Sequence, residues 1–224
     1  MVENLKHDVD SIVNLSGGLE CAAALWYAKA KGYNPVALHL YNKAWGESAD
    51  AQLEAAQKQA DLMKVRLLVD EANMPQDWNG LNYPVLQHQS AICTLIQGNR
   101  KIKWKAIIWG ANSDDSFKQR LQLKFPFRAL ACGWSKTLDP HGIHPRHVLQ
   151  LPINLFPFEW MQKSEIVAAL IQAKPDLLEL VHSCIKTINK KPCEVCTKCI
   201  ELTYAKRVAM KSVNKRQEGI WRDI

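Results

Sequence analysis

Four cysteines toward the C-terminal end of the chain have the clearest chemical spacing. Cys193, Cys196 and Cys199 recur at every third position, and Cys184 lies a short loop upstream. Cysteines grouped in this way form the tetrahedral shell that zinc prefers, and a shell of four thiolates leaves no open coordination position for catalysis. We therefore predict a structural zinc site. Buried thiols and redox-active thiols are the competing interpretations.

The segment Ser16-Gly17-Gly18 is the second place where residue types indicate chemistry. It follows a short β-branched run, residues 9–15, which predicts a buried strand, and it precedes an alanine-rich helix, residues 21–31, that Gly32 would end. Such a turn presents backbone N–H groups and a helix dipole to an anion, and Ser16 can donate its hydroxyl. The spacing is neither the Walker motif nor the dinucleotide fingerprint. The alternative is a turn that binds no ligand.

The elements that must position these residues alternate between strand and helix. Further strands are predicted at 35–41, 65–69, 106–109 and 148–153. Helices are predicted at 84–101, 162–172 and 176–182, and one that Ser48 or Asp50 would cap reaches Met63. Successive β-α-β units form right-handed crossovers and a parallel sheet. The predicted fold is α/β, a doubly wound, mostly parallel, Rossmann-like sheet of five strands with the glycine loop at its ligand-binding edge.

Composition and charge narrow the classes of protein. Hydrophobic residues make up 47% of the 224 residues, which is enough for a core, and no apolar run approaches the about 18 residues that span a bilayer. A net charge of +7 suits a nucleotide or a nucleic acid, although a solvated surface explains it equally well. Residues 1–10 do not read as a secretory signal, so we expect a cytoplasmic protein without disulfides.

In series, these segments resemble the N-type ATP pyrophosphatases (adenine nucleotide alpha hydrolase-like) and, among them, the 7-cyano-7-deazaguanine synthase family. Ser16-Gly17-Gly18-Leu19-Glu20-Cys21 is similar to the family's Ser-Gly-Gly-x-Asp-Ser loop, and Cys184, Cys193, Cys196 and Cys199 match its zinc cysteines. The other matching segments are Tyr41-Asn42, Trp109-Gly110 through Asp115, Leu151-Pro152, and Trp160 with Lys163 and Glu165.

The resemblance implies an ATP-dependent C–N ligase. It would use ATP with Mg²⁺ to adenylate a 7-carboxy-7-deazaguanine-like substrate, and ammonia would give the amide and then the nitrile, as in queuosine biosynthesis. ATP would be held by Ser16, Gly17, Gly18, Leu19, Glu20, Cys21 and Tyr41. Lys163 would face the phosphates, unless it is only a surface lysine at a helix start, and Asp115 would contact substrate or metal.

The resemblance also predicts how the chain is organised. Residues 1–175 would form the ATP-pyrophosphatase-like α/β domain, and residues 176–224 a helical, zinc-binding region packed on the same core. A homodimer is a possible assembly. We expect no membrane partner, and a nucleic acid is a possible but less favoured one.

The loop departs from the family at two positions, and this supports a second functional class. Glu20 replaces an aspartate, which shifts the carboxylate by about an ångström, and Cys21 replaces a serine with a poorer hydrogen-bond donor. An arginine and an asparagine of the family are also missing from residues 83–87. The second prediction is a catalytically altered relative that binds a nucleotide or deazapurine, or an assembly subunit. A third, an RNA-directed enzyme, is suggested by the basic C-terminal tail and disfavoured by the cysteine order.

Overall fold

A computed structural model describes residues 5, 8–72, 91–96, 98–99, 101–114 and 152–213. Its centre is a five-stranded sheet in the order β3-β2-β1-β4-β5, and every pair of neighbouring strands is parallel. The strands are β1 (Ser11–Asn14), β2 (Pro35–Asn42), β3 (Leu67–Ala72), β4 (Ala106–Ile108) and β5 (Ile153–Leu155). The predicted doubly wound, parallel α/β fold is confirmed.

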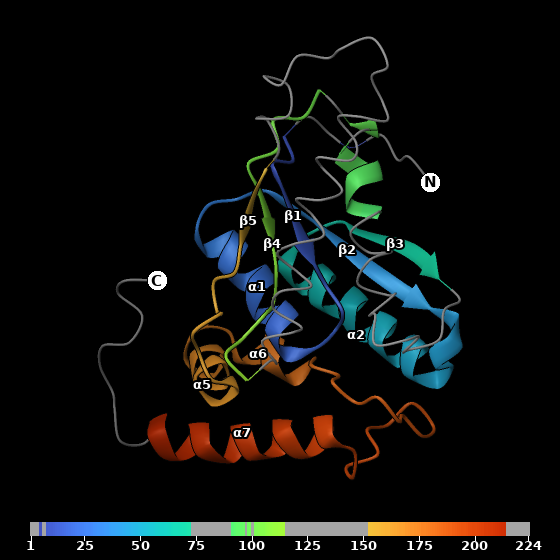
Figure 1. The fold of residues 1–224 in the computed structure, drawn as a ribbon. Helices are drawn as coiled ribbons and strands as arrows, with labels where there is room; N and C mark the ends of the chain where they lie inside the picture. The colour runs from blue at the N-terminus through green and yellow to red at the C-terminus, as the bar shows by residue number, and fades with distance from the viewer. Residues whose placement is uncertain are drawn as a thin grey trace.

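The helices of the described residues connect these strands and extend the chain beyond the sheet. They are α1 (Leu19–Ala30), η1 (Lys43–Trp45), α2 (Glu47–Met63), α5 (Lys163–Ala173), α6 (Pro175–Glu179) and α7 (Thr197–Val213), and residues 91–96 are also helical. Figure 1 shows α7 running along the outside of the molecule beneath α5. In the part of the chain that the structure describes, no helix combines the length and apolarity needed to cross a membrane.

Two apolar cores lie on opposite faces of the sheet, as expected for parallel strands covered on both sides. Neighbouring residues of β1 point to different cores, because side chains alternate along a strand. Val13 packs with α1, α2, α5 and α7, whereas Ile12 packs with the helical residues 91–96, and both are fully buried. The central strand is therefore held rigidly from both sides, and the loop at its end starts from a fixed point.

Several element boundaries differ from the sequence predictions. Helix α1 begins at Leu19 because Gly18 is its extended N-cap. Helix α2 is capped by Gly46, with φ of +53°, so the prediction that Ser48 or Asp50 caps it was wrong. Ser48 lies inside the first turn, and its Oγ accepts a hydrogen bond from the N–H of Thr187. A residue inside the helix is used to attach the distant cysteine segment.

At the C-terminal side, the predicted elements are present with shifted limits. The helix that was placed at 162–172 is α5, which starts one residue later, and the one placed at 176–182 is the shorter α6. Strand β5 begins at Ile153, where it pairs with Ala106. Of the predicted strand at 148–153, Pro152 and Ile153 lie within the described residues and residues 148–151 lie outside them. So do Asp115 and the first part of the predicted helix at 84–101.

Candidate functional site

The glycine loop is a turn whose backbone is fixed from two sides. Gly17 has φ of +84°, and a Cβ built on it would lie 2.5 Å from the carbonyl oxygen of Gln52, so only glycine fits. The Gly17 carbonyl accepts hydrogen bonds from the N–H of His182 and from Nε2 of Gln59, both at 2.9 Å. The loop is therefore rigid before any ligand arrives.

Helix α1 starts from a glycine, so its N-cap residue has no side chain that could bind the N–H groups of the first turn. Gly18 is the N-cap residue and makes no side-chain cap bond. The hydroxyl of Ser16 accepts from the N–H of Gly18 at 3.3 Å and donates to Sγ of Cys21 at 3.2 Å, which holds the serine at the mouth of the helix. A helix N-terminus left in this state favours a negatively charged group.

A cavity of about 490 Å³ opens directly onto this loop. The loop and α1 contribute Ser16, Gly18, Glu20 and Cys21 to its wall. The segment after β2 contributes Ala44, Trp45, Ser48 and Gln52. The remaining lining residues are Gly110, Lys163, His182, Ser183, Ile185 and Lys198. The volume lies in the range of small-molecule sites, which is roughly 300–1,000 Å³.

Gly110 sets how closely the loop after β4 approaches α1. A Cβ at this position would lie 2.5 Å from the backbone carbon of Glu20 and 2.6 Å from the nitrogen of Cys21. No side chain can be accommodated there without moving backbone. The glycine brings Asn112 within reach of α1, and Nδ2 of Asn112 donates to Oε1 of Glu20 at 2.8 Å.

Lys163 lies between two carboxylates at one side of the cavity. Its Nζ is 3.2 Å from Oε1 of Glu20 and 2.7 Å from Oε2 of Glu201, and its side chain is only 11% exposed. Burial lowers the pKa of Lys163, but the two carboxylates outweigh it and raise the pKa above its usual value. Lys163 therefore remains a cation and neutralises Glu20 at the head of the helix.

The same cluster extends to α7. Burial raises the pKa of Glu201, but the hydrogen bond from Lys163 and the charge of Lys198 outweigh this and lower it. Nζ of Lys198 is 3.2 Å from Oε2 of Glu201. Four alternating charges thus run from α1 to α7, and Glu20 is the member closest to the loop.

Asp114, together with a capping box formed by Gln162 and Glu165, holds the start of α5. Oδ2 of Asp114 accepts from the backbone N–H of Lys163 at 2.8 Å, and Oδ1 of Asn112 accepts from the N–H of Asp114 at 2.7 Å. Asp115, which the resemblance predicts to contact substrate or metal, lies outside the described residues. Asn112, Asp114, Lys198 and Glu201 were all missed.

The structure brings together most of the residues predicted for ATP. Ser16, Gly18, Glu20, Cys21 and Lys163 line the cavity. Leu19 is fully buried in the core. The hydroxyl of Tyr41 donates to Oδ1 of Asp50 at 2.6 Å, and this bond raises the pKa of the tyrosine. Gly17, Leu19 and Tyr41 are not part of the cavity wall, whereas Trp45, at the end of η1 after β2, is.

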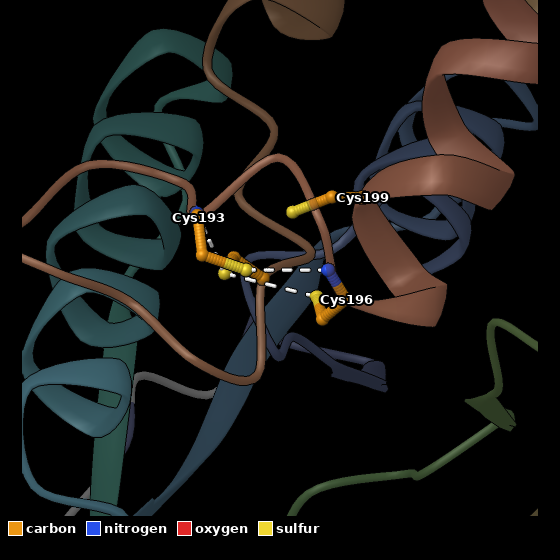
Figure 2. A group of neighbouring side chains, drawn as sticks. Cys193, Cys196 and Cys199 are labelled. Carbon is orange, nitrogen blue, oxygen red and sulfur yellow. Dashed lines mark hydrogen bonds between the residues drawn. The ribbon is translucent and has the colours of Figure 1, made fainter.

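The four predicted cysteines lie close together, and Figure 2 labels three of them, Cys193, Cys196 and Cys199. Their sulfur atoms all lie within 4.8 Å of one another, and those of Cys184 and Cys196 are 3.9 Å apart. Thiolates at a zinc–sulfur distance of about 2.3 Å in a tetrahedron are separated by about 3.8 Å. All four are free cysteines. The donor set and its spacing fit a zinc ion.

Backbone N–H groups donate hydrogen bonds to the sulfurs of Cys184 and Cys193. Sγ of Cys184 accepts from the N–H groups of Lys186 and Cys193, both at 3.3 Å, and Sγ of Cys193 accepts from the N–H of Cys196 at 3.3 Å. Burial raises the pKa of Cys184, but these donors outweigh it and lower the pKa. Such second-layer contacts orient and tune metal ligands. Nε2 of His182 instead lies 2.9 Å from Oγ1 of Thr187.

Comparisons with known proteins find a family model that matches part of the sequence and a similarity to solved structures. A family model described as "Family of unknown function (DUF6395)" matches residues 161–218, which include α5, α6, the cysteines and α7. No curated protein matches the sequence. Among solved structures, the chain is similar to NMN synthetase from Francisella tularensis, with 12% identity and a TM-score of 0.46 over 96% of this chain and 90% of that one. A similarity of that size carries no functional argument.

Proposed function

We propose that this protein is an ATP-dependent enzyme that adenylates a carboxylate. The observation that carries the proposal is the cavity at the carboxyl end of β1, where the rigid Ser16-Gly17-Gly18 turn meets the start of α1, whose N-cap residue is a glycine. Ligands of open α/β sheets bind at this edge. Backbone N–H groups at a helix start are suited to the phosphates of a nucleotide.

The cavity offers different surroundings to the two ends of ATP. Ala44, Trp45 and Ile185 are apolar residues of the wall on which a base could stack, whereas the glycine loop and Lys198 are polar groups that could bind phosphates. Glu20 is the carboxylate of the wall that suits Mg²⁺, which prefers oxygen ligands. Mg²⁺ would add positive charge at the phosphates. Lys163 neutralises the negative charge of Glu20, so the carboxylate would repel ATP less when ATP enters without Mg²⁺.

The sequence resemblance supplies the reaction that we assign to this pocket. A substrate carboxylate oxygen attacks the α-phosphorus of ATP, and the bond to pyrophosphate breaks. Ammonia then attacks the acyl carbon and AMP leaves, which gives an amide. A second ATP activates the amide oxygen, and loss of AMP and a proton gives the nitrile. Loop N–H groups would stabilise the charge on the departing pyrophosphate. The substrate we propose is 7-carboxy-7-deazaguanine or a close analogue.

The test is release of pyrophosphate by zinc-loaded protein with ATP, Mg²⁺, 7-carboxy-7-deazaguanine and ammonia. We expect release that depends on the carboxylate and that falls strongly in Lys163→Ala. Lys174→Ala is the matched control, because Lys174 lies at the other end of α5 and pairs with Asp176 at 3.6 Å. Release that is independent of the carboxylate, or equal in the two variants, would contradict the proposed reaction.

A second candidate, a relative that binds a nucleotide without turning it over, is favoured by one observation. The amine that the resemblance assigns to the phosphates is already engaged by both Glu20 and Glu201. Calorimetry distinguishes the two candidates: ATP binding without pyrophosphate release for any deazapurine carboxylate supports the binding role.

We also propose that residues 1–175 and 176–224 are the two parts of the chain, sharing a core through α5 and α7.

A further inference from the structure

The cavity wall and the cysteine cluster are made by the same short stretch of chain. Ser183 and Ile185 line the cavity and flank Cys184, while Lys198 lines it and directly precedes Cys199. Glu201, which binds Lys163, follows Cys199 by two residues. Side chains of one segment therefore alternate between the cavity and the sulfur cluster. Any change in the geometry of the cluster displaces the wall.

Hydrogen bonds transmit the position of this segment to the glycine loop. The N–H of His182 binds the carbonyl of Gly17 at 2.9 Å, and Nε2 of Gln52 binds the carbonyl of Cys184 at 3.4 Å. Gln52 is also the residue whose carbonyl contacts the Gly17 position. The loop, α2 and the segment that begins at His182 thus form one connected unit.

Lys198 is the cation that this segment presents to the cavity. Lys163 is 11% exposed and lies between two carboxylates, so its charge is committed to the protein. The side chain of Lys198 is 41% exposed, and the ion pair it forms within the described residues is with Glu201, whose carboxylate it shares with Lys163. A triphosphate in the cavity can draw the Lys198 amine away from Glu201, because Lys163 continues to neutralise that carboxylate.

We infer that a metal ion at the four cysteines and the nucleotide bind cooperatively, with Lys198 as the phosphate contact that the metal site positions. The inference rests on the proposed nucleotide binding and adds its regulation. A metal that fixes Cys196 and Cys199 fixes the first turn of α7, and with it Lys198. Coupling of this kind is reciprocal, so the nucleotide must raise metal affinity by the factor by which the metal raises nucleotide affinity.

The experiment compares ATP affinity by calorimetry in zinc-loaded and zinc-free protein, with circular dichroism to verify that the zinc-free chain is folded. We expect about tenfold tighter ATP binding in the loaded protein, a typical coupling factor. The reciprocal measurement is a chelator competition for zinc with and without ATP, which should show the same factor. Neither readout depends on turnover.

Variants in the loaded protein test the inference even if the zinc-free chain unfolds. Lys198→Ala should keep full zinc content and weaken ATP binding about tenfold, as expected for loss of a charged contact, with a much smaller effect on AMP. Lys211→Ala, an exposed lysine of the same helix, is the control and should change neither. Unchanged ATP affinity in Lys198→Ala, or equal affinities with and without zinc, overturns the inference and leaves nucleotide binding intact. Absence of ATP binding in the loaded protein overturns both.

Discussion

Oε1 of Glu20 lies 3.2 Å from the ammonium of Lys163, although the two residues belong to α1 and α5, which are far apart in sequence. Glu20 is in the first turn of α1, where an anionic ligand would have to approach its carboxylate. Lys163 removes most of that repulsion. The pair therefore neutralises a carboxylate at the entrance of an anion site, and it links α1 to α5.

The first prediction concerns this pair. Lys163→Ala leaves the Glu20 carboxylate partly buried without its cation, and ATP affinity should fall about tenfold because the carboxylate then repels phosphate. Adding Glu20→Gln to that variant should restore much of the loss, since the amide carries no charge. The comparison is made by calorimetry on both variants. Equal affinity in the single and double variants would show that charge neutralisation is not the function of Lys163.

The second prediction concerns Gly110. Gly110→Ala should destabilise the protein by about 2 kcal/mol, because its Cβ overlaps the backbone of α1 and overpacking costs this much. It should also weaken ATP binding by displacing Glu20. Gly32→Ala is the control: Gly32 has φ of +78° with open space around it, so we expect a cost of about 1 kcal/mol and normal ATP binding. Urea denaturation and calorimetry measure the two effects, and normal ATP binding by the Gly110 variant would refute the proposed role.

The third prediction concerns the metal. Cys184→Ser should abolish stoichiometric zinc binding and lower the melting temperature, since a shell of four thiolates loses one ligand. Cys93→Ser, at a buried cysteine outside the cluster whose pKa burial raises to about 11, should keep its zinc. Metal content by mass spectrometry and thermal melts check both. Retention of zinc by the Cys184 variant would contradict the four-cysteine assignment.

The fourth prediction concerns pH and the edge of the sheet. Asp10 is 2.8 Å from Lys105 and accepts from the N–H of Asn34 at 2.9 Å. Burial raises the pKa of Asp10, but these partners outweigh it, so the pKa lies below the ordinary value of 3.8. A depressed carboxyl pKa stabilises the fold above pH 3.8, and this stabilisation is lost as the pH falls through the lower, folded-state value.

Asp10→Asn should therefore lose about 1 kcal/mol of unfolding free energy at pH 7, as for one charged hydrogen bond. The difference from the natural chain should shrink as the pH falls below that window. Denaturant titrations at several pH values measure it. Asp61→Asn is the control, because Asp61 is an exposed acceptor for Gln57 and should show little change. A difference independent of pH would argue against the charge of Asp10 as its source.

Much of the fold follows from local pattern, and much of the site does not. The β-branched run of β1, the glycine turn and the alanine-rich α1 are continuous in sequence, so their order and the edge at which the loop lies could be predicted. The cysteines were recognisable because their spacing is short. Both kinds of signal depend on neighbours along the chain.

The contacts missed from the sequence are those between distant segments. Glu201 binds Lys163 only because α7 folds back against α5, and nothing in the sequence around Glu201 indicates this. Asp114 caps α5 from a loop nearly fifty residues earlier, whereas capping rules read only the residues next to a helix. The sequence Asn112-Ser113-Asp114 favours a turn in which the Asn112 side-chain oxygen accepts from the Asp114 N–H, and this local signal could have indicated the position of Asp114 in the loop after β4.

The bond between the Gly17 carbonyl and the N–H of His182 also determines when the loop can be completed during synthesis. The loop leaves the ribosome before His182, which follows Gly17 by more than a hundred and sixty residues. Until then, β1 and α1 can form, but the turn between them lacks the hydrogen bond from the N–H of His182. A nascent or truncated chain that ends before His182 would therefore carry an unfinished loop, and competence to bind would arise only once the cysteine segment has been synthesised.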